Sequence, residues 1–167
     1  MATPTNLPVA EVAYTTLAAS WLNDLRGAFR ILQVVQGTYS TPVVSSSTTY
    51  ADTGLSATIT PQSSTSKILV LVHQASCGKV AGNAQTHMYL QLLRNSTSVI
   101  VFDGSATYTN SSADNYIGTV STAYLDSPAT TSAITYKTQF RNNVNAASVA
   151  VQVNSTTSTI TLLEVSA

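Results

Sequence analysis

The amino-acid sequence predicts an all-β protein: an antiparallel β-sandwich of jelly-roll type, preceded by a short N-terminal α-helix. From residue 34 onward, segments of alternating apolar and polar residues follow one another, separated by clusters of Ser, Thr, Asn, Gly and Pro. No helical pattern lies between these segments, which favours an antiparallel sandwich over an α/β fold. We therefore expect an N-terminal anchoring segment at 1–33 and a β-sandwich domain at 34–167.

The N-terminal segment carries apolar residues at spacings of three and four, the period of an α-helix. The face they form consists of Leu17, Trp21, Leu22, Leu25 and Phe29. Thr15 or Thr16 can cap the start of this helix. A single amphipathic helix of about 15 residues is only marginally stable in water. We therefore expect its apolar face to pack on the following domain, on copies of itself or on another protein.

The strands follow from the period-two alternation of apolar and polar residues. Residues 134–141 and 149–153 alternate strictly, whereas 67–72 is apolar on both faces, which is typical of a central strand. Further strands are expected at 32–39, 55–60, 86–94, 98–103, 115–125 and 159–165. Turn-forming residues mark the loops between them, at 40–48, 61–66, 78–86, 104–114, 126–132 and 154–158.

Two expected strands, 86–94 and 159–165, carry apolar residues on both faces. A strand in a two-layer sandwich needs only one apolar face. The additional apolar residues are Tyr89, Leu93, Leu163 and Val165. They predict a buried subunit interface, most simply around a symmetry axis. The alternative is that the N-terminal helix covers this face within one chain.

The composition argues against several classes of function. Of 167 residues, 7 are Lys or Arg and 7 are Asp or Glu, and the polar surface must come largely from 26 threonines and 22 serines. The absence of net charge and of any basic cluster argues against nucleic-acid binding. Few ionisable groups are available for catalysis, and the longest apolar run, 68–72, is too short to cross a membrane. We expect a protein that is not an enzyme and binds neither nucleic acid nor membrane.

Metal and catalytic sites are not predicted. His73, Cys77 and His87 lack the tight paired spacing of zinc ligands, so no metal and no cofactor is expected. Four aspartates fall in expected turns, where Asp forms local backbone hydrogen bonds: Asp52, Asp103, Asp114 and Asp126. This interpretation competes with a glycosidase built on two carboxylates, and we favour the turn residues.

Four tyrosines in or beside expected loops are candidate ligand-binding residues: Tyr39, Tyr50, Tyr108 and Tyr116. An exposed aromatic face can stack on a sugar ring while the phenol hydroxyl forms a hydrogen bond. The alternative is that each is a tyrosine at the edge of the core with only its hydroxyl in water. As a group they predict a binding surface, with the 104–116 loop foremost.

Several segments resemble, in the same order, the β-domain of many bacteriophage tail-fibre and related virion proteins, especially those of phages of cyanobacteria. They are residues 48–61 (TTYADTGLSATITP), 63–70 (SSTSKILV), 87–94 (HMYLQLLR), 124–140 (YLDSPATTSAITYKTQF) and 158–164 (STITLLE). The likeness spans about 35–167. Residues 17–25 (LAASWLNDL) are similar to the short anchoring helices that open such proteins.

The resemblance implies a virion structural protein of the short tail-fibre or receptor-binding type. It implies a homotrimeric jelly roll, loosely like the complement and tumour-necrosis-factor trimers, docked to the particle by its N-terminal helix. The implied partners are copies of itself, other phage virion proteins of the tail or capsid, and host surface polysaccharide. The chain lacks the long shaft of a full fibre. This leaves open the alternative of a capsid decoration (cement) or head-fibre protein that reinforces the shell without binding a receptor.

Overall fold

The computed structural model describes residues 30–80, 83–144 and 147–166. The expected N-terminal helix, with Leu17, Trp21, Leu22, Leu25 and Phe29, lies outside the described residues. So does the greater part of the anchoring segment at 1–33.

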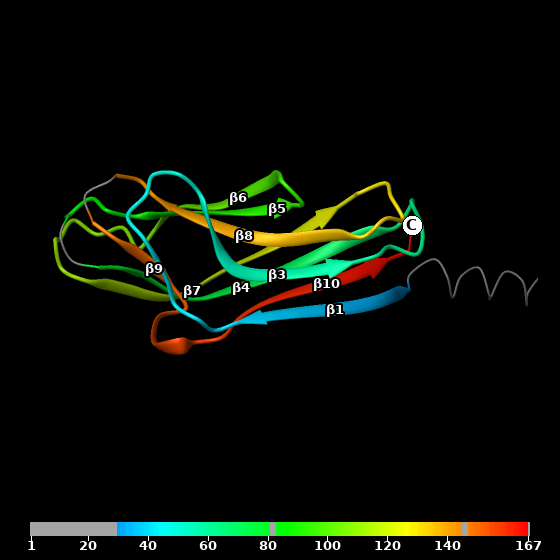
Figure 1. Ribbon diagram of the computed structural model, residues 1–167, viewed down its shortest axis with the longest axis horizontal. Coiled ribbons are helices and arrows are strands. Elements are labelled where there is room, and N and C mark those ends of the chain that lie inside the picture. The colour runs from blue at the N-terminus through cyan, green and yellow to red at the C-terminus, as the bar shows by residue number, and fades with distance from the viewer. Residues whose placement is uncertain (1–29, 81–82, 145–146, 167) are drawn as a thin grey trace, which may run out of the picture.

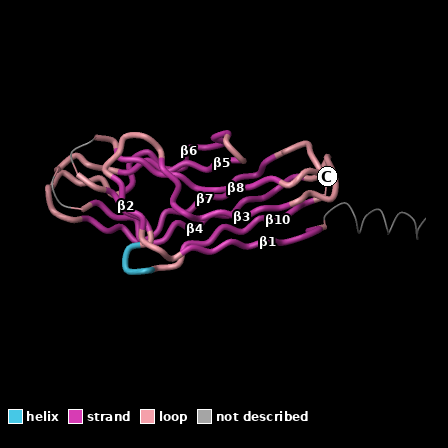
Figure 2. Tube along the Cα trace, viewed as in Figure 1, coloured by secondary structure: helices cyan, strands magenta, loops and turns pink. Residues whose placement is uncertain are grey.

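The described chain is all-β and consists of two antiparallel sheets (Figures 1 and 2), which confirms the predicted fold class at this level. The strands are β1 (Ile31–Tyr39), β2 (Val43–Ser45), β3 (Ala51–Ile59), β4 (Lys67–Lys79), β5 (Met88–Arg94), β6 (Thr97–Ala106), β7 (Asn115–Asp126), β8 (Ile134–Asn142), β9 (Val149–Val151) and β10 (Ser158–Val165). One short 3₁₀ helix, η1 (Val153–Ser155), joins β9 to β10.

The long strand β4 organises the larger sheet, here called sheet A. Its first part pairs with β10 on one side and β7 on the other, and β1 completes this half of the sheet beside β10. Its last residues pair with β9, which in turn pairs with β2. The smaller sheet, sheet B, has the order β3-β8-β5-β6. Most connections cross from one sheet to the other, so the chain wraps around its own core.

The apolar phase of the alternating strand β8 faces the interior, as the sequence predicts. In β8 the residues Ile134, Tyr136, Thr138 and Phe140 are buried, and the residues between them are only partly buried. One apolar cluster surrounds Tyr136 and a second surrounds Phe140. These two clusters form the core between the sheets.

A polar cross-link joins the two sheets between the apolar clusters. Thr138 lies between Tyr136 and Phe140 on β8, and its hydroxyl donates to Gln74 Oε1 of β4 at 2.9 Å. The Gln74 side-chain amide donates to Ser158 Oγ of β10 at 3.0 Å. Because these groups are buried, their mutual hydrogen bonds are needed to offset the cost of removing them from water.

Several strand bounds differ from the prediction: β3 begins at Ala51 and β6 continues to Ala106, and two further differences concern β2 and β4. The short strand β2 lies inside the expected loop 40–48, and β4 continues to Lys79, into the expected loop 78–86. In both places the strand exists because a partner is present: β9 pairs with β2 and with the end of β4. Such pairing depends on residues more than 60 positions away, which local alternation does not reveal.

The two sheets come into close contact along their β1 and β3 edges. A Cβ atom added at Gly37 would lie 2.0 Å from the backbone oxygen of Ser56. No side chain fits in that space, so glycine is required for this close approach. The consequence is a sandwich that is closed along this edge.

Candidate functional site

The outer surface of sheet A carries an apolar row that crosses four strands. Val34 of β1 lies opposite Leu163 of β10, Leu163 lies opposite Leu69 of β4, and Leu69 lies opposite Leu125 of β7. Directly opposed residues in antiparallel strands share a face of the sheet. In β10 and β4 the neighbours of these leucines are buried in the core, so the row faces outward.

Further apolar side chains extend this row. Ile31 and Val165 are paired beside it, and Leu71 follows Leu69 on the same face of β4. We call the set Ile31, Val34, Leu69, Leu71, Leu125, Leu163 and Val165 the apolar face. Four of its members are strongly exposed: Ile31 at 52%, Val34 at 58%, Leu71 at 40% and Leu125 at 53%. A contiguous exposed apolar patch is uncommon on a monomer and typically marks an interaction surface.

The apolar face borders the point where the N-terminal segment joins the sandwich. Arg30 N donates to Ser166 Oγ at 3.2 Å, and Ser166 N donates to Arg30 O at 3.0 Å. These contacts continue the β1–β10 ladder and hold the first described residue beside the end of β10. Anything that covers the apolar face therefore lies close to where residues 1–29 enter.

Only two of the four predicted interface residues belong to the apolar face. Leu163 and Val165 lie there, whereas Tyr89 and Leu93 lie on the outer side of sheet B, opposite the buried residues of β5. Leu93 is only 5% exposed within the single chain. The Tyr89 ring is covered in part by Arg141, whose Cζ lies 3.8 Å from the ring centroid.

The four predicted ligand-binding tyrosines are also divided. Tyr39 packs against the β-sandwich core and lies over Gly54, and Tyr116 lies over Gly78 of sheet A. Tyr50 and Tyr108 instead join a group on the outer side of sheet B. Tyr39 is therefore a tyrosine at the edge of the core, the alternative that the sequence left open.

A strip of aromatic and cationic side chains crosses the outer side of sheet B. The guanidinium carbon of Arg141 lies 3.8 Å from the Tyr89 ring centroid and 5.3 Å from that of Tyr50. The His87 ring lies 5.5 Å from Tyr89 and 5.7 Å from Tyr108, edge-on to the latter. We call these five residues the Tyr–Arg strip. Register explains it, because Arg141 is paired with Tyr89 across β8 and β5.

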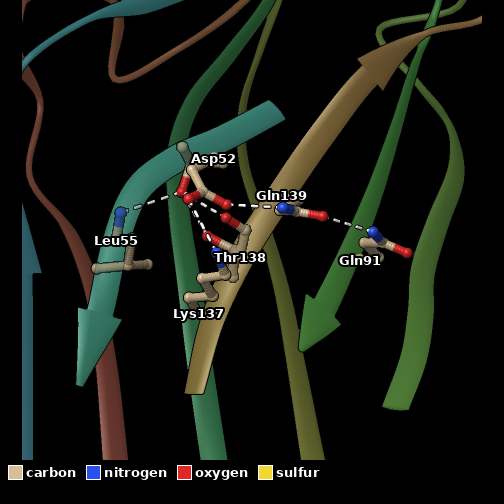
Figure 3. A network of polar contacts seen from close by, with 7 residues as sticks. Asp52, Leu55, Gln91, Lys137, Thr138 and Gln139 are labelled. Carbon is tan, nitrogen blue, oxygen red and sulfur yellow. Dashed lines mark hydrogen bonds and ion pairs between the residues drawn. The ribbon is translucent and has the colours of Figure 1, made fainter. Parts of the chain in front are cut away.

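A ladder of polar side chains runs beside the Tyr–Arg strip (Figure 3). Asp52 accepts hydrogen bonds from Lys137 Nζ at 2.9 Å and from Gln139 Nε2 at 2.7 Å. Gln91 Nε2 donates to Gln139 Oε1 at 2.8 Å, and Ser98 Oγ donates to Gln91 Oε1 at 2.9 Å. Partial burial alone would raise the pKa of Asp52, but the hydrogen bonds from Gln139 and Lys137 and the lysine charge outweigh it and lower that pKa.

A buried lysine fixes the loop that carries Tyr108. Lys79 has no exposed surface, and its ammonium lies 2.6 Å from both Thr109 Oγ1 and Ser111 O. It also donates to the backbone oxygens of Asn83 and Ala84, at 3.3 and 3.4 Å. The ammonium thereby joins the segments before β5 and before β7, since each supplies two oxygen acceptors.

Metal and thiol chemistry has no support among the described residues. No group of three or more His, Cys, Asp or Glu side chains there is placed to hold a metal ion. His73 is exposed on sheet A, while Cys77 is buried beyond an irregularity in the β4–β7 pairing. Burial raises the pKa of the Cys77 thiol to about 12, which makes it a poor nucleophile. No helix in the described ranges has the length and apolar character needed to span a bilayer.

In the sequence, His87 was a possible metal ligand and Tyr89 a predicted interface residue, and nothing marked Arg141 as a functional residue. The alternation of the sequence carries a signal for all three: Tyr89 and Arg141 lie on the outward face of β5 and β8, and His87 stands two residues before Tyr89, in the same phase.

No protein-family model matches the chain, and no curated protein matches it in sequence.

Proposed function

We propose that this chain is a bacteriophage virion structural protein of the short tail-fibre or receptor-binding type. It forms a homotrimer through the apolar face of sheet A and docks to the particle through its N-terminal segment. The observation that carries the proposal is the apolar row Val34–Leu163–Leu69–Leu125, which crosses the whole width of this half of the sheet. The order of the segments that resemble phage fibre β-domains supports it independently.

The apolar face has the chemistry expected of contact between copies of the chain. Fully burying one large apolar side chain contributes roughly 1.5–3 kcal/mol. Its four most exposed members retain about half of their surface, so burying them contributes roughly 3–6 kcal/mol per protomer. Homo-oligomers with closed symmetry are the usual way in which soluble proteins bury such a surface.

The position of the face also suits docking by the N-terminal segment. Residue 30 borders the apolar face, so copies packed through this face would bring their N-terminal segments to the same end. The sequence predicts an amphipathic helix there, with Trp21 and Phe29 on its apolar side. Gathering such helices would offset their marginal individual stability.

The strand order fits a jelly roll, the fold type expected of such a domain. Apart from the short strands β2 and β9, the long strands form sheets of order β1-β10-β4-β7 and β3-β8-β5-β6. The chain passes repeatedly between these sheets, as in a double-sheet jelly roll.

Two measurements test the proposal. Sedimentation equilibrium should give a mass three times the chain mass of 17.5 kDa. Electron microscopy of phage particles labelled with antibody to this protein should show it on the tail. Label over the head would favour capsid decoration, and a monomer at all concentrations together with unlabelled particles would overturn the proposal.

The anchoring role has its own test. A Trp21→Ala, Phe29→Ala double variant should leave the melting of the β-sandwich unchanged and reduce incorporation into particles. Normal incorporation would contradict anchoring by this segment.

A further inference from the structure

We infer that the outer side of sheet B is a binding site for acidic saccharides, with Arg141 as the group that receives the sugar carboxylate and Tyr108 as the stacking platform. The inference rests on the proposed function only in that sheet A, and not sheet B, is covered by other copies. The Tyr–Arg strip and the polar ladder beside it together form this site.

Arg141 is a positioned cation to which the described residues offer no acidic partner. Its guanidinium lies on the Tyr89 ring at 3.8 Å, which fixes the plane of the group. One of its nitrogens, Nη1, donates to Asn142 O at 3.0 Å. Within the described part of the chain, no carboxylate lies within ion-pair distance of it. A planar guanidinium carries five N–H donors in a geometry that matches a carboxylate with two parallel hydrogen bonds.

The aromatic part of the strip provides a surface for sugar rings. Tyr108 is 51% exposed, and because its ring is tilted by 72° from the His87 ring, His87 can cover at most one of its two faces. The apolar C–H side of a pyranose can stack on such a face, and aromatic surface is well suited to this because few torsions are lost on binding. His87 Nδ1 lies 2.9 Å from Gln85 O, and in the tautomer that donates there Nε2 is an acceptor for a sugar hydroxyl.

The polar ladder supplies oriented hydrogen-bonding groups beside the strip. Asp52, Gln139 and Gln91 hold one another in place, so their remaining acceptor and donor positions are preorganised for hydroxyls. Lys137 is paired with Asp52 at 2.9 Å. This pairing offsets the negative charge of Asp52, which would otherwise oppose an acidic ligand, and it leaves Arg141 as the cation of the strip available to the ligand.

An extended chain suits the site better than a single sugar. The strip runs from Tyr50 through Arg141, Tyr89 and His87 to Tyr108, so several rings can be contacted in succession. A polyphosphate chain is less suitable, because Arg141 is the one guanidinium or ammonium group of the strip and the protein has no net charge.

Isothermal titration calorimetry with an oligogalacturonate tests this inference on the full-length protein. We expect saturable binding that weakens as ionic strength rises from about 0.05 to 0.5 M, because the site is open to solvent and screened by salt. Arg141→Gln should weaken binding at least about tenfold, the effect of losing one charge-assisted contact. Tyr108→Ala should also weaken binding.

Tyr116→Ala is the matched control. Tyr116 has the same exposed fraction as Tyr108, 51%, but lies on sheet A over Gly78, so binding should be unchanged. The fully methyl-esterified oligosaccharide should bind much more weakly than the acid form. Circular dichroism melting of each variant shows whether it is folded.

Three results would overturn the inference: no heat of binding at millimolar oligogalacturonate, equal binding of the acid and the methyl ester, or unchanged binding by folded Arg141→Gln. Sedimentation of the same samples separates these failures from failure of the proposed function. If the protein is a trimer that binds no uronate, only the saccharide site is refuted. If it is a monomer that binds uronate, only the proposed assembly is refuted.

Discussion

Replacing Leu125 by Asp places a carboxylate on the apolar face while leaving the core untouched. Leu125 lies at the end of the row on β7 and is 53% exposed in the single chain. Because about half of this side chain is already in water, the isolated sandwich should lose only roughly 0.8–1.5 kcal/mol of unfolding free energy. The folded monomer is therefore expected to survive the change.

The effect on assembly is expected to be much larger. Each protomer would lose the apolar contribution of one side chain and would have to bury a carboxylate without a partner, which costs several kcal/mol per ion. For three copies the sum is on the order of 10 kcal/mol per trimer. Since every 1.4 kcal/mol changes an equilibrium constant about tenfold, the trimer should not form at micromolar concentration.

Sedimentation velocity measures this directly, with Val101→Asp as the matched control. Val101 is 52% exposed on β6 of sheet B, so the same chemical change is made at equal exposure on the opposite side of the sandwich. Val101→Asp should sediment as the unsubstituted trimer does, and Leu125→Asp as a folded monomer. If both variants keep the oligomeric state of the original protein, the apolar face is not the interface.

Four further substitutions or conditions follow from individual contacts. Burial alone would raise the pKa of Glu164, but hydrogen bonds, among them one from Gln33 Nε2 at 2.6 Å, outweigh it and hold the pKa below its ordinary value. Its stabilisation is therefore present above the unfolded-state pKa and is lost as the pH falls through the folded one, so melting temperature should drop on acidification, and less so in Glu164→Gln. Tyr136→Phe removes a 2.7 Å hydrogen bond to Asp126 and should lower the unfolding free energy in urea by about 1.5–3 kcal/mol; no change would contradict a charge-assisted bond. Lys79→Met leaves partly buried oxygen acceptors without their cation and should cost about 1–3 kcal/mol and speed amide exchange near Thr109, whereas unchanged exchange would show that the ammonium does not hold the loop. Cys77 should resist iodoacetamide at pH 8 until the protein unfolds, and rapid alkylation of the folded protein would contradict its burial.

The inward and outward faces of the strands were predictable from the sequence. Alternation in 134–141 places Tyr136 and Phe140 on one side and Lys137 and Arg141 on the other, and the structure has them so. This succeeds because the side-chain period of a strand is two whatever its partners are. The same logic found Leu163 and Val165 as additional outward apolar residues.

Which outward residues lie together was not predictable. Tyr39 and Tyr50 both stand beside loops, yet Tyr39 packs over Gly54 at the β1–β3 edge and Tyr50 faces Arg141. Tyr89 and Leu163 look alike as additional apolar residues but lie on opposite outer sides of the sandwich. Which outward residues become neighbours depends on strand order and register, and both are set by contacts between distant segments.

The sequence by itself determined the class of the fold, the core-facing phase of the strictly alternating segment 134–141 and a surface made largely of hydroxyls rather than charges. The tertiary structure decided that Val34, Leu69, Leu125 and Leu163 form one row, although they are spread over most of the chain. It likewise decided that Arg141 lies on Tyr89. The physical reason is that alternation is a local property of the backbone, whereas the neighbours across a sheet are chosen by how the whole core is buried.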